Sequence, residues 1–332
     1  MKKKKVLVIG GGTGTYTVLS GLKKYPLALS VIVSMTDSGG SNRVIRDEFG
    51  LLPTSDIRQC MVALTSPKSH EVLRELFTYR YNQGVGISGM SFGNLFMAAL
   101  TDIYGSQEKA IKKTCEILDV DGEIIPVTFD NVHLIAKYTN GRQILGEHFI
   151  DEPDTKQGKH RIETLEVIPK ARVNPKALRA IKSADCIVLG PGDLYTSLIC
   201  NLIIEGVADA IRKSKAKKVF VVNLMTKFGQ TNGFGARDHL RILEKYLGDG
   251  TLDYCMVSKN GSFPKNILKR YKQEESELVV DDFKDSVKGP KIVRGNFFSK
   301  KIHLKVKGDV LDRSLIRHDP DKLARAIVAI LK

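Results

Sequence analysis

A short apolar run near the start of the chain ends in a glycine-rich turn, and this feature most constrains the fold. Residues 5–9 read as a β-strand, four of the residues in 10–14 are glycine, and residues 15–24 have the pattern of a helix. A second β-branched run follows at residues 30–35. This order is the opening of a βαβ unit, in which a crossover helix joins two parallel strands. The start of the chain therefore predicts a parallel sheet.

The same alternation of strands and helices resumes in the second half of the chain. Strand-like runs at 186–189, 219–224 and 254–258 alternate with helical patterns at 196–211, 237–247 and 321–331. Their near-continuous Val and Ile content indicates strands buried on both faces. Further helical patterns cover 56–65, 69–79, 92–104 and 107–118. We therefore predict an α/β protein with a doubly wound, mainly parallel sheet, Rossmann-like and three-layered.

The alternation of predicted strands and helices is absent between residues 121 and 170. Strand-like pieces at 123–129, 133–138, 143–150 and 162–169 follow one another without helices, with a turn signal at Asn140-Gly141. We expect an inserted antiparallel β subdomain at 121–170, with 1–120 and 171–332 forming the two parts of the nucleotide-binding α/β core.

The chain of 332 residues carries a net charge of +15, which raises the question of nucleic-acid binding. The basic residues are densest at 2–5, 212–218 and 300–307 and form no continuous stripe. The middle cluster falls between a helix and a strand, where cations complement the C-terminus of the helix. We therefore expect nucleic-acid binding to be weak and non-specific.

The five cysteines are far apart and have no zinc-site spacing. They fit a reducing cytoplasm. No apolar run approaches the length of a membrane span, so the sequence predicts a cytoplasmic protein.

Small polar loops follow four of the predicted strands, at residues 10–15, 36–41, 190–197 and 223–226. In an open parallel sheet, ligands bind where such loops meet at the carboxyl ends of the strands. Glycine lets backbone N–H groups approach an anion, and helix N-termini favour negative charge. The loops predict a phosphate or nucleotide site with these contacts: Gly11, Gly12, Thr13, Gly14, Asp37, Ser41, Gly190, Pro191, Gly192, Ser197, Asn223, Met225 and Thr226.

Several of these residues allow a second reading. The first loop lacks the third glycine of G-x-G-x-x-G and the Gly-Lys pair of a P-loop, so alone it could be only a turn. Asp37 could grip a ribose hydroxyl, bind a metal such as Mg²⁺, or form an Asx turn.

Two further segments carry candidate ligand contacts. Ser91 and Asn94 begin a helix, so Ser91 is either a ligand contact or an N-cap. Asp56 could cap its helix, whereas Arg58 offers a donor fork for phosphate or carboxylate. His318 precedes the last helix and reads as a surface residue.

Seven ordered motifs resemble the gluconeogenesis-factor family (YvcK-like), relatives of the 2-phospho-L-lactate transferases (CofD-like). The motifs are Gly10-Gly11-Gly12-Thr13-Gly14, Asp37 with Gly39-Gly40-Ser41, Asp56-Ile57-Arg58, Ser91-Phe92-Gly93-Asn94-Leu95, Leu189-Gly190-Pro191-Gly192 with Leu194-Tyr195-Thr196-Ser197, Asn223 with Met225-Thr226, and Arg317-His318-Asp319. The resemblance covers nearly the whole chain. It implies a nucleotide-binding α/β fold.

The chain departs from the family pattern at three places. Asp37-Ser38 stands where the family commonly has two aspartates, Met90 where it has a histidine, and residues 227–231 where it has Gln-Pro-Gly-Glu-Thr. The missing carboxylate and imidazole weaken the case for metal-assisted transferase chemistry. They do not affect the glycine-containing loops that are predicted to bind the nucleotide.

The resemblance also implies a function and two more site residues. The bacterial branch is associated with cell shape and growth on gluconeogenic carbon sources, and it binds a UDP-sugar such as UDP-GlcNAc. By that similarity Tyr271 and Arg317 would contact the ligand, the tyrosine by ring stacking and the arginine by gripping the diphosphate. Tyr271 could instead only pack. Other partners of such a regulator would be a cell-wall regulatory protein or further copies of the chain.

The sequence allows three functional hypotheses. The first is a regulatory protein that binds a nucleotide sugar and catalyses nothing. The second is a Mg²⁺-dependent transferase of the phospholactate type acting on a nucleotide-linked substrate, with GDP as a possible nucleotide. The third is an NAD-binding oxidoreductase, suggested by the glycine turn alone.

Overall fold

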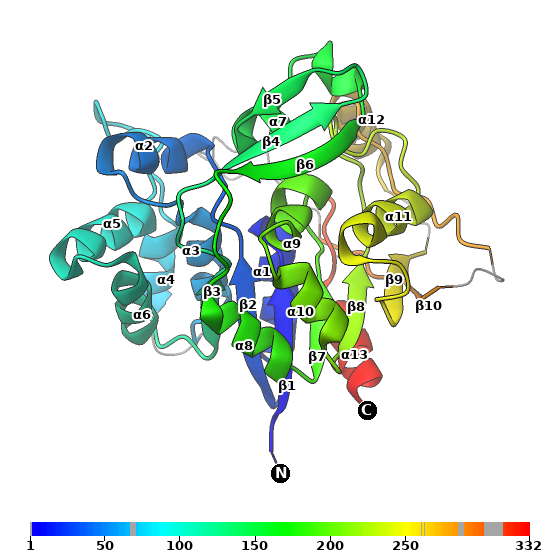
Figure 1. Cartoon of the computed structure of the whole chain (residues 1–332), viewed down its shortest axis with the longest axis horizontal. Coiled ribbons are helices and arrows are strands. Elements are labelled where there is room, and N and C mark those ends of the chain that lie inside the picture. The colour runs from blue at the N-terminus through cyan, green and yellow to red at the C-terminus, as the bar shows by residue number, and fades with distance from the viewer. Residues whose placement is uncertain (1, 67–70, 260, 262, 285–288, 302–314) are drawn as a thin grey trace.

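The computed structural model describes residues 2–66, 71–259, 261, 263–284, 289–301 and 315–332, and its centre is a seven-stranded parallel sheet (Figure 1). The strand order is β10-β9-β8-β7-β1-β2-β3. The strands are β1 (Lys4–Ile9), β2 (Leu27–Val33), β3 (Glu123–Pro126), β7 (Cys186–Leu189), β8 (Lys217–Val221), β9 (Tyr254–Ser258) and β10 (Lys291–Gly295). The predicted α/β fold with a mainly parallel sheet is confirmed.

The sheet divides the apolar interior into two cores, one on each face, as the inner strand β1 illustrates. This strand pairs in parallel with β2 and β7, so that Val8 lies opposite Val31 and Val188. Alternate residues of a strand point to opposite faces. Val8 accordingly packs into one core and Leu7 into the other, each fully buried. This two-sided burial explains the continuous Val and Ile runs of the sequence.

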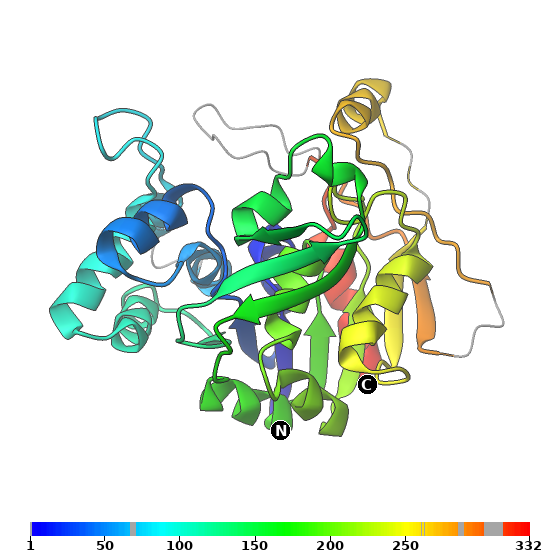
Figure 2. The same cartoon turned by 45° about the horizontal axis from the view of Figure 1, so that its top comes forward.

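Helices cover both faces of the sheet. One core contains buried residues of α1 (Gly12–Leu22), α3 (Ser55–Leu64) and α13 (Pro320–Leu331). The other contains residues of α8 (Pro175–Ser183), α10 (Val207–Lys213) and α11 (Ala236–Leu247). A further lobe beyond β2 and β3 consists of α2 (Gly40–Phe49), α4 (Glu71–Thr78), α5 (Phe92–Tyr104) and α6 (Gln107–Ile117) (Figures 1 and 2).

A separate three-stranded antiparallel sheet lies above the carboxyl ends of the central strands (Figures 1 and 2). Its order is β5 (Gln143–Leu145), β4 (His133–Tyr138) and β6 (Ile162–Ile168). The short helix α7 (Glu147–Asp151) and one turn of 3-10 helix, η1 (Gln157–Lys159), connect β5 to β6. This sheet and α7 together cover the edge of the central sheet where the sequence predicts the site, and we call them the roof.

Two strands predicted within 121–170 differ from the structure, one in the sheet that it joins and the other in its length. Residues 123–129 do not join the antiparallel sheet, because β3 pairs in parallel with β2, with Ser30 opposite Glu123. Residues 143–150 form a strand only as far as Leu145. Gly146, whose φ of 103° is rare for other residues, turns the chain from β5 into α7.

The helix predicted at 196–211 is interrupted. A π-helical turn, η2 (Leu194–Ile199), leads into α9 (Cys200–Leu202), and α10 begins only after Gly206, whose φ of 92° cannot continue a right-handed helix. The sequence patterns described above predict none of α2, α8 and β10.

The basic cluster at 212–218 has the predicted structural setting. Arg212 and Lys213 form the last turn of α10, where cations complement the helix dipole. The Nη1 group of Arg212 donates a hydrogen bond of 2.9 Å to the carbonyl oxygen of Leu247. Most of the cluster at 300–307 lies outside the described residues.

No single helix in the described part of the chain is long and apolar enough to cross a membrane. A pair of helices bent by 75°, Leu194–Leu202 with Val207–Lys213, meets the criterion by length and composition only.

Gly21 allows α1 and α13 to approach closely, and we predict that Gly21→Ala is destabilising. A Cβ atom at Gly21 would lie 2.1 Å from the carbonyl oxygen of Pro320 and 3.0 Å from the Cβ atom of Ala324. The helices must therefore separate, and overpacking of this kind costs about 1–3 kcal/mol. Thermal or urea unfolding measures the loss. Ser20→Ala in the same helix is the control, since it removes a hydroxyl without adding bulk. Equal stability of the two variants would contradict the prediction.

Candidate functional site

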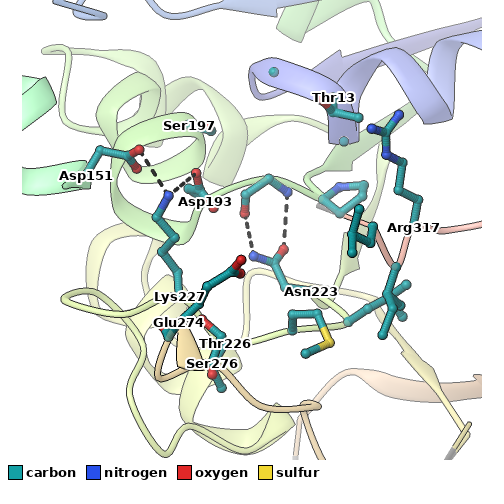
Figure 3. A pocket seen from close by; sticks show the side chains of 18 of the residues that line it. Thr13, Asp151, Asp193, Ser197, Asn223, Thr226, Lys227, Glu274, Ser276 and Arg317 are labelled. Atoms are coloured by element: carbon teal, nitrogen blue, oxygen red, sulfur yellow. Dashed lines mark hydrogen bonds and ion pairs between the residues drawn. The ribbon is translucent and has the colours of Figure 1, made fainter. Parts of the chain in front are cut away.

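A cavity with a volume of about 570 Å³ lies at the carboxyl ends of β1, β7 and β8, where the sequence predicts the site (Figure 3). Besides the loops after these strands, its walls come from α7, from α12 (Lys265–Gln273) and from residues 315–318. The sequence-predicted residues that line it are Gly11, Gly12, Thr13, Gly14, Pro191, Gly192, Ser197, Asn223, Met225, Thr226, Tyr271 and Arg317.

The glycine loop after β1 is held by a buried carboxylate from a neighbouring helix. The Gly12 N–H group donates a hydrogen bond of 2.9 Å to Oδ1 of Asp56, in the first turn of α3. A Cβ atom at Gly11 would lie 2.1 Å from the other carboxylate oxygen of Asp56. Asp56 therefore does not cap its own helix. It fixes the glycine loop at the start of α1.

Burial raises the pKa of Asp56 to about 7. The nearby carboxylate of Asp37 acts in the same direction, whereas the hydrogen bond from Gly12 and the charge of Arg58 oppose it. The folded state therefore binds the Asp56 proton more tightly than the unfolded chain does.

The loops after β7 and β8 are joined by an amide side chain. Asn223 accepts a hydrogen bond from the Gly192 N–H group at 3.2 Å and donates one to the Gly192 carbonyl oxygen at 2.7 Å (Figure 3). Gly14 fits against the same loop, because a Cβ atom there would lie 2.2 Å from the Pro191 carbonyl oxygen. The three loops thus form one continuous wall of the cavity.

One end of the cavity is rich in carboxylates. Lys227 lies 3.1 Å from Asp151 and 4.0 Å from Asp193, and Figure 3 shows the lysine pointing between the two acids. Burial alone would lower the pKa of Lys227, but Asp193 and Asp151 outweigh it and raise that pKa. Burial raises the pKa of Asp193 to about 6, against the opposing charge of Lys227.

Asp151 belongs to α7 and makes side-chain contacts that connect the roof to the α/β core. Besides Lys227, it accepts hydrogen bonds from Thr196 at 3.2 Å and from Gln230 at 2.9 Å. The antiparallel sheet is thereby fixed to the loops after both β7 and β8.

Arg317 lies on the opposite side of the cavity, near Thr13 (Figure 3). The segment that carries it is held by Tyr271, whose hydroxyl oxygen accepts the N–H groups of Leu315 at 2.8 Å and Ile316 at 3.0 Å. Tyr271 is buried, with an exposed fraction of 6%, in a small apolar cluster. It therefore packs, and it also lines the cavity.

His318 is buried and lines the cavity, so the prediction of a surface position is wrong. Burial lowers its pKa to about 3. The imidazole is consequently neutral at physiological pH.

Seven predicted contact residues lie outside the cavity lining: Asp37, Ser41, Asp56, Arg58, Ser91, Asn94 and Gly190. Most of them form a polar network beside it, in which Asn94 joins Ser41 at 2.9 Å to Arg58 at 3.1 Å. Arg58 is buried and also donates to the Phe77 carbonyl oxygen at 2.8 Å. Ser91 is the N-cap of α5 and accepts the Asn94 N–H group at 3.3 Å. These residues support the loops.

Asp37 forms the Asx turn that was the alternative to a ligand role. Its carboxylate accepts the Gly39 N–H group at 2.9 Å and the Asn42 side-chain amide at 2.5 Å. Burial nevertheless raises the pKa of Asp37. A second carboxyl group, that of Glu147, approaches from α7 and accepts the Ser38 N–H group at 3.2 Å. The roof thus supplies a carboxyl group beside the position where the family has its second aspartate.

This acidic region does not provide a metal site with protein ligands alone. Among the described residues, no group of three or more His, Cys, Asp or Glu side chains could hold a metal ion. Mg²⁺ is commonly held by one or two carboxylates together with substrate phosphates, so a metal at Asp37 stays a prediction.

The carboxylate end of the cavity has little signal in the sequence. Asp151, Lys227 and Glu274 line it, yet none belongs to a glycine loop. Asp151 directly follows the predicted strand 143–150, and residues 227–231 stand out in the sequence only as a departure from the family pattern. Asp193, in contrast, lies within the predicted loop 190–197 and could have been chosen as a polar residue beside Gly192.

Comparison with known proteins defines the class to which this fold and site belong. Residues 6–298 match the family described as 2-phospho-L-lactate transferase CofD, and the chain belongs to this family. A crystal structure of a member of the UPF0052 family from Bacillus halodurans superposes with a TM-score of 0.88 at 33% identity, covering 99% of each chain.

Two relatives of known name indicate which members of the family this chain is similar to. A Thermoanaerobacterium thermosulfurigenes protein is 42% identical over 99% of this chain and 97% of its own length. A Bacillus subtilis protein, 32% identical over 100% of this chain and 99% of its own length, is named "Gluconeogenesis factor". The predicted resemblance is confirmed.

The pKa of Asp56 predicts how stability depends on pH. Because its pKa is about 7 in the folded protein and near 4 in an unfolded chain, the favourable contribution of the protonated group is lost as pH rises through 7. The free energy of unfolding should therefore fall between pH 5 and 7.5, and Asp56→Asn should reduce this fall by ~1 kcal/mol or more.

Urea unfolding at both pH values measures the effect. Asp102→Asn, which changes an exposed aspartate on α5, is the control. The assignment would be wrong if Asp56→Asn and the control showed the same pH dependence as the unchanged protein.

Proposed function

We propose that the protein binds a nucleotide sugar of the UDP-GlcNAc type in the cavity and acts as a cytoplasmic regulatory protein. As in the gluconeogenesis factors that it resembles, the regulated process would be the maintenance of cell shape during growth on gluconeogenic carbon sources. The observation that carries the proposal is the wall of glycine loops facing Arg317. Backbone N–H groups at the start of α1 and a guanidinium group are complementary to a diphosphate.

The bonding of the acidic groups favours binding over catalysis. The Asp56 carboxylate accepts a hydrogen bond from the Gly12 N–H group, and the Asp37 carboxylate accepts one from the Gly39 N–H group of its own turn. Lys227 is paired with Asp151 and Asp193, and His318 is neutral and buried. A general base must reach its substrate and exchange a proton near neutral pH. Asp37, Asp56, Lys227 and His318 do not meet both conditions, and Asp193, which lines the cavity, is paired with Lys227. The five free cysteines support a reducing compartment.

The transferase hypothesis has support of its own, because the family model is named after a transferase and matches residues 6–298. Transfer of the phospholactyl group from a GDP-linked lactate analogue to an added deazaflavin acceptor, with release of GMP in proportion to protein and time, would assign the protein to that class. The oxidoreductase hypothesis has less support. The acid that would grip the ribose, Asp37, is engaged in its own turn outside the cavity.

We predict that Arg317→Ala weakens UDP-GlcNAc binding at least tenfold without unfolding the protein. Hydrogen bonds to charged groups contribute about 1.5–3 kcal/mol, and 1.4 kcal/mol corresponds to a factor of ten in affinity. Isothermal titration calorimetry measures the affinity. Arg241→Ala, which removes an exposed arginine of α11 outside the cavity, is the control. Unchanged affinity in Arg317→Ala would remove the proposed diphosphate contact.

Tyr271→Phe tests whether Tyr271 acts through the segment that carries Arg317. The variant keeps the ring that lines the cavity and removes the oxygen that accepts the N–H groups of Leu315 and Ile316. We expect a smaller loss of affinity than in Arg317→Ala, and little further loss when the two substitutions are combined. Additive losses in the double variant would show that Tyr271 contributes independently of Arg317.

A further inference from the structure

The lining of the cavity has a strong charge asymmetry along its length (Figure 3). Thr13 and Arg317 lie at one end with the glycine loop, whereas Lys227 and its two acidic partners lie at the other. Asn223, bonded to Gly192, stands between the two ends. A ligand that spans the cavity therefore meets two different electrostatic environments.

The second end, which we call the acidic end, has more carboxylates than cations. Its charged lining residues are Asp151, Glu152, Asp193 and Glu274, against Lys227 and Arg270. The two cations are already paired, Lys227 with Asp151 and Asp193, and Arg270 with Glu274 at 2.8 Å. The excess of negative charge makes this end unfavourable for a phosphate or any other anion.

Carboxylates are, however, good acceptors for hydroxyl groups. A hydroxyl that donates to an ionised carboxylate forms a charge-assisted hydrogen bond, which is stronger than a neutral one. The side chains of Asp193 and Glu274 retain exposed fractions of 38% and 42%, so a ligand can reach them. Ser276, which also lines the cavity beside Glu274, adds a hydroxyl group.

We infer that the acidic end receives the sugar of the nucleotide sugar and selects uncharged sugars over those that carry a carboxylate. The inference rests on the proposed function and adds the specificity of that site. With the diphosphate at the glycine loop and Arg317, the sugar hydroxyls donate to the carboxylates of the acidic end. A sugar carboxylate would instead meet like charges without a free cation among these lining residues.

UDP-glucose and UDP-glucuronate form a suitable pair of probes, because they differ only in a hydroxymethyl against a carboxylate group. We expect UDP-glucuronate to bind roughly tenfold or more weakly than UDP-glucose, since like charges brought together at a binding site strongly reduce affinity. Calorimetric titration at fixed ionic strength measures both affinities, and UDP serves as the probe that lacks the sugar.

Variants at the acidic end identify the source of the selectivity. The double variant Asp193→Asn/Glu274→Gln keeps side-chain size and acceptor oxygens while removing two negative charges. It should narrow the difference between the two UDP-sugars to roughly threefold or less. Glu116→Gln, which removes an exposed carboxylate outside the cavity lining, should leave the difference unchanged. The affinity for UDP and the melting temperature report whether each variant is folded.

The outcomes separate the inference from the proposed function. If UDP and both UDP-sugars bind with similar affinity, or if the difference persists in the double variant, the acidic end does not select the sugar and the inference is overturned. If neither UDP nor a UDP-sugar binds, the proposed function itself fails, and the inference with it.

Discussion

The hydrogen bond between the Gly12 N–H group and the buried Asp56 carboxylate is the contact on which the geometry of the site depends. It joins the start of α1 to the first turn of α3, two helices that pack in the same core. The fit leaves no space for a side chain at Gly11. The glycine loop is therefore a fixed wall whose position is set by the core, which favours binding because little conformational entropy remains to be lost.

A second set of contacts closes the cavity from above. The helix α7 is only five residues long, yet it reaches the loop after β2 through Glu147 and the loops after β7 and β8 through Asp151. Segments that are distant in sequence thus meet around one cavity. The ends of the cavity differ in charge because Arg317 comes from the chain before α13, whereas the carboxylates come mainly from α7 and the loop after β7.

The fold and one wall of the site could be predicted from the sequence because they depend on local patterns. The alternation of β-branched strands with helices predicted the parallel sheet, and loops such as 10–15 and 190–197 follow directly from strand ends. The pairing of β3 could not be predicted in this way. Its sequence lies next to the strands of the antiparallel sheet, and nothing in it indicates that its partner is β2. The hydrogen bond by which Asp56 holds the glycine loop could not be predicted either, because its partner Gly12 is distant in sequence. The acidic end depends on tertiary contacts of the same kind, such as that between Asp151 and Lys227.

The most direct test of the account is a crystal structure of the protein with UDP-GlcNAc bound. We predict that the diphosphate lies against the glycine loop at residues 11–14 and within hydrogen-bonding distance of the Arg317 guanidinium group, with the sugar directed toward Asp193. A ligand bound outside this cavity, or a diphosphate placed against Asp151 and Asp193, would contradict it.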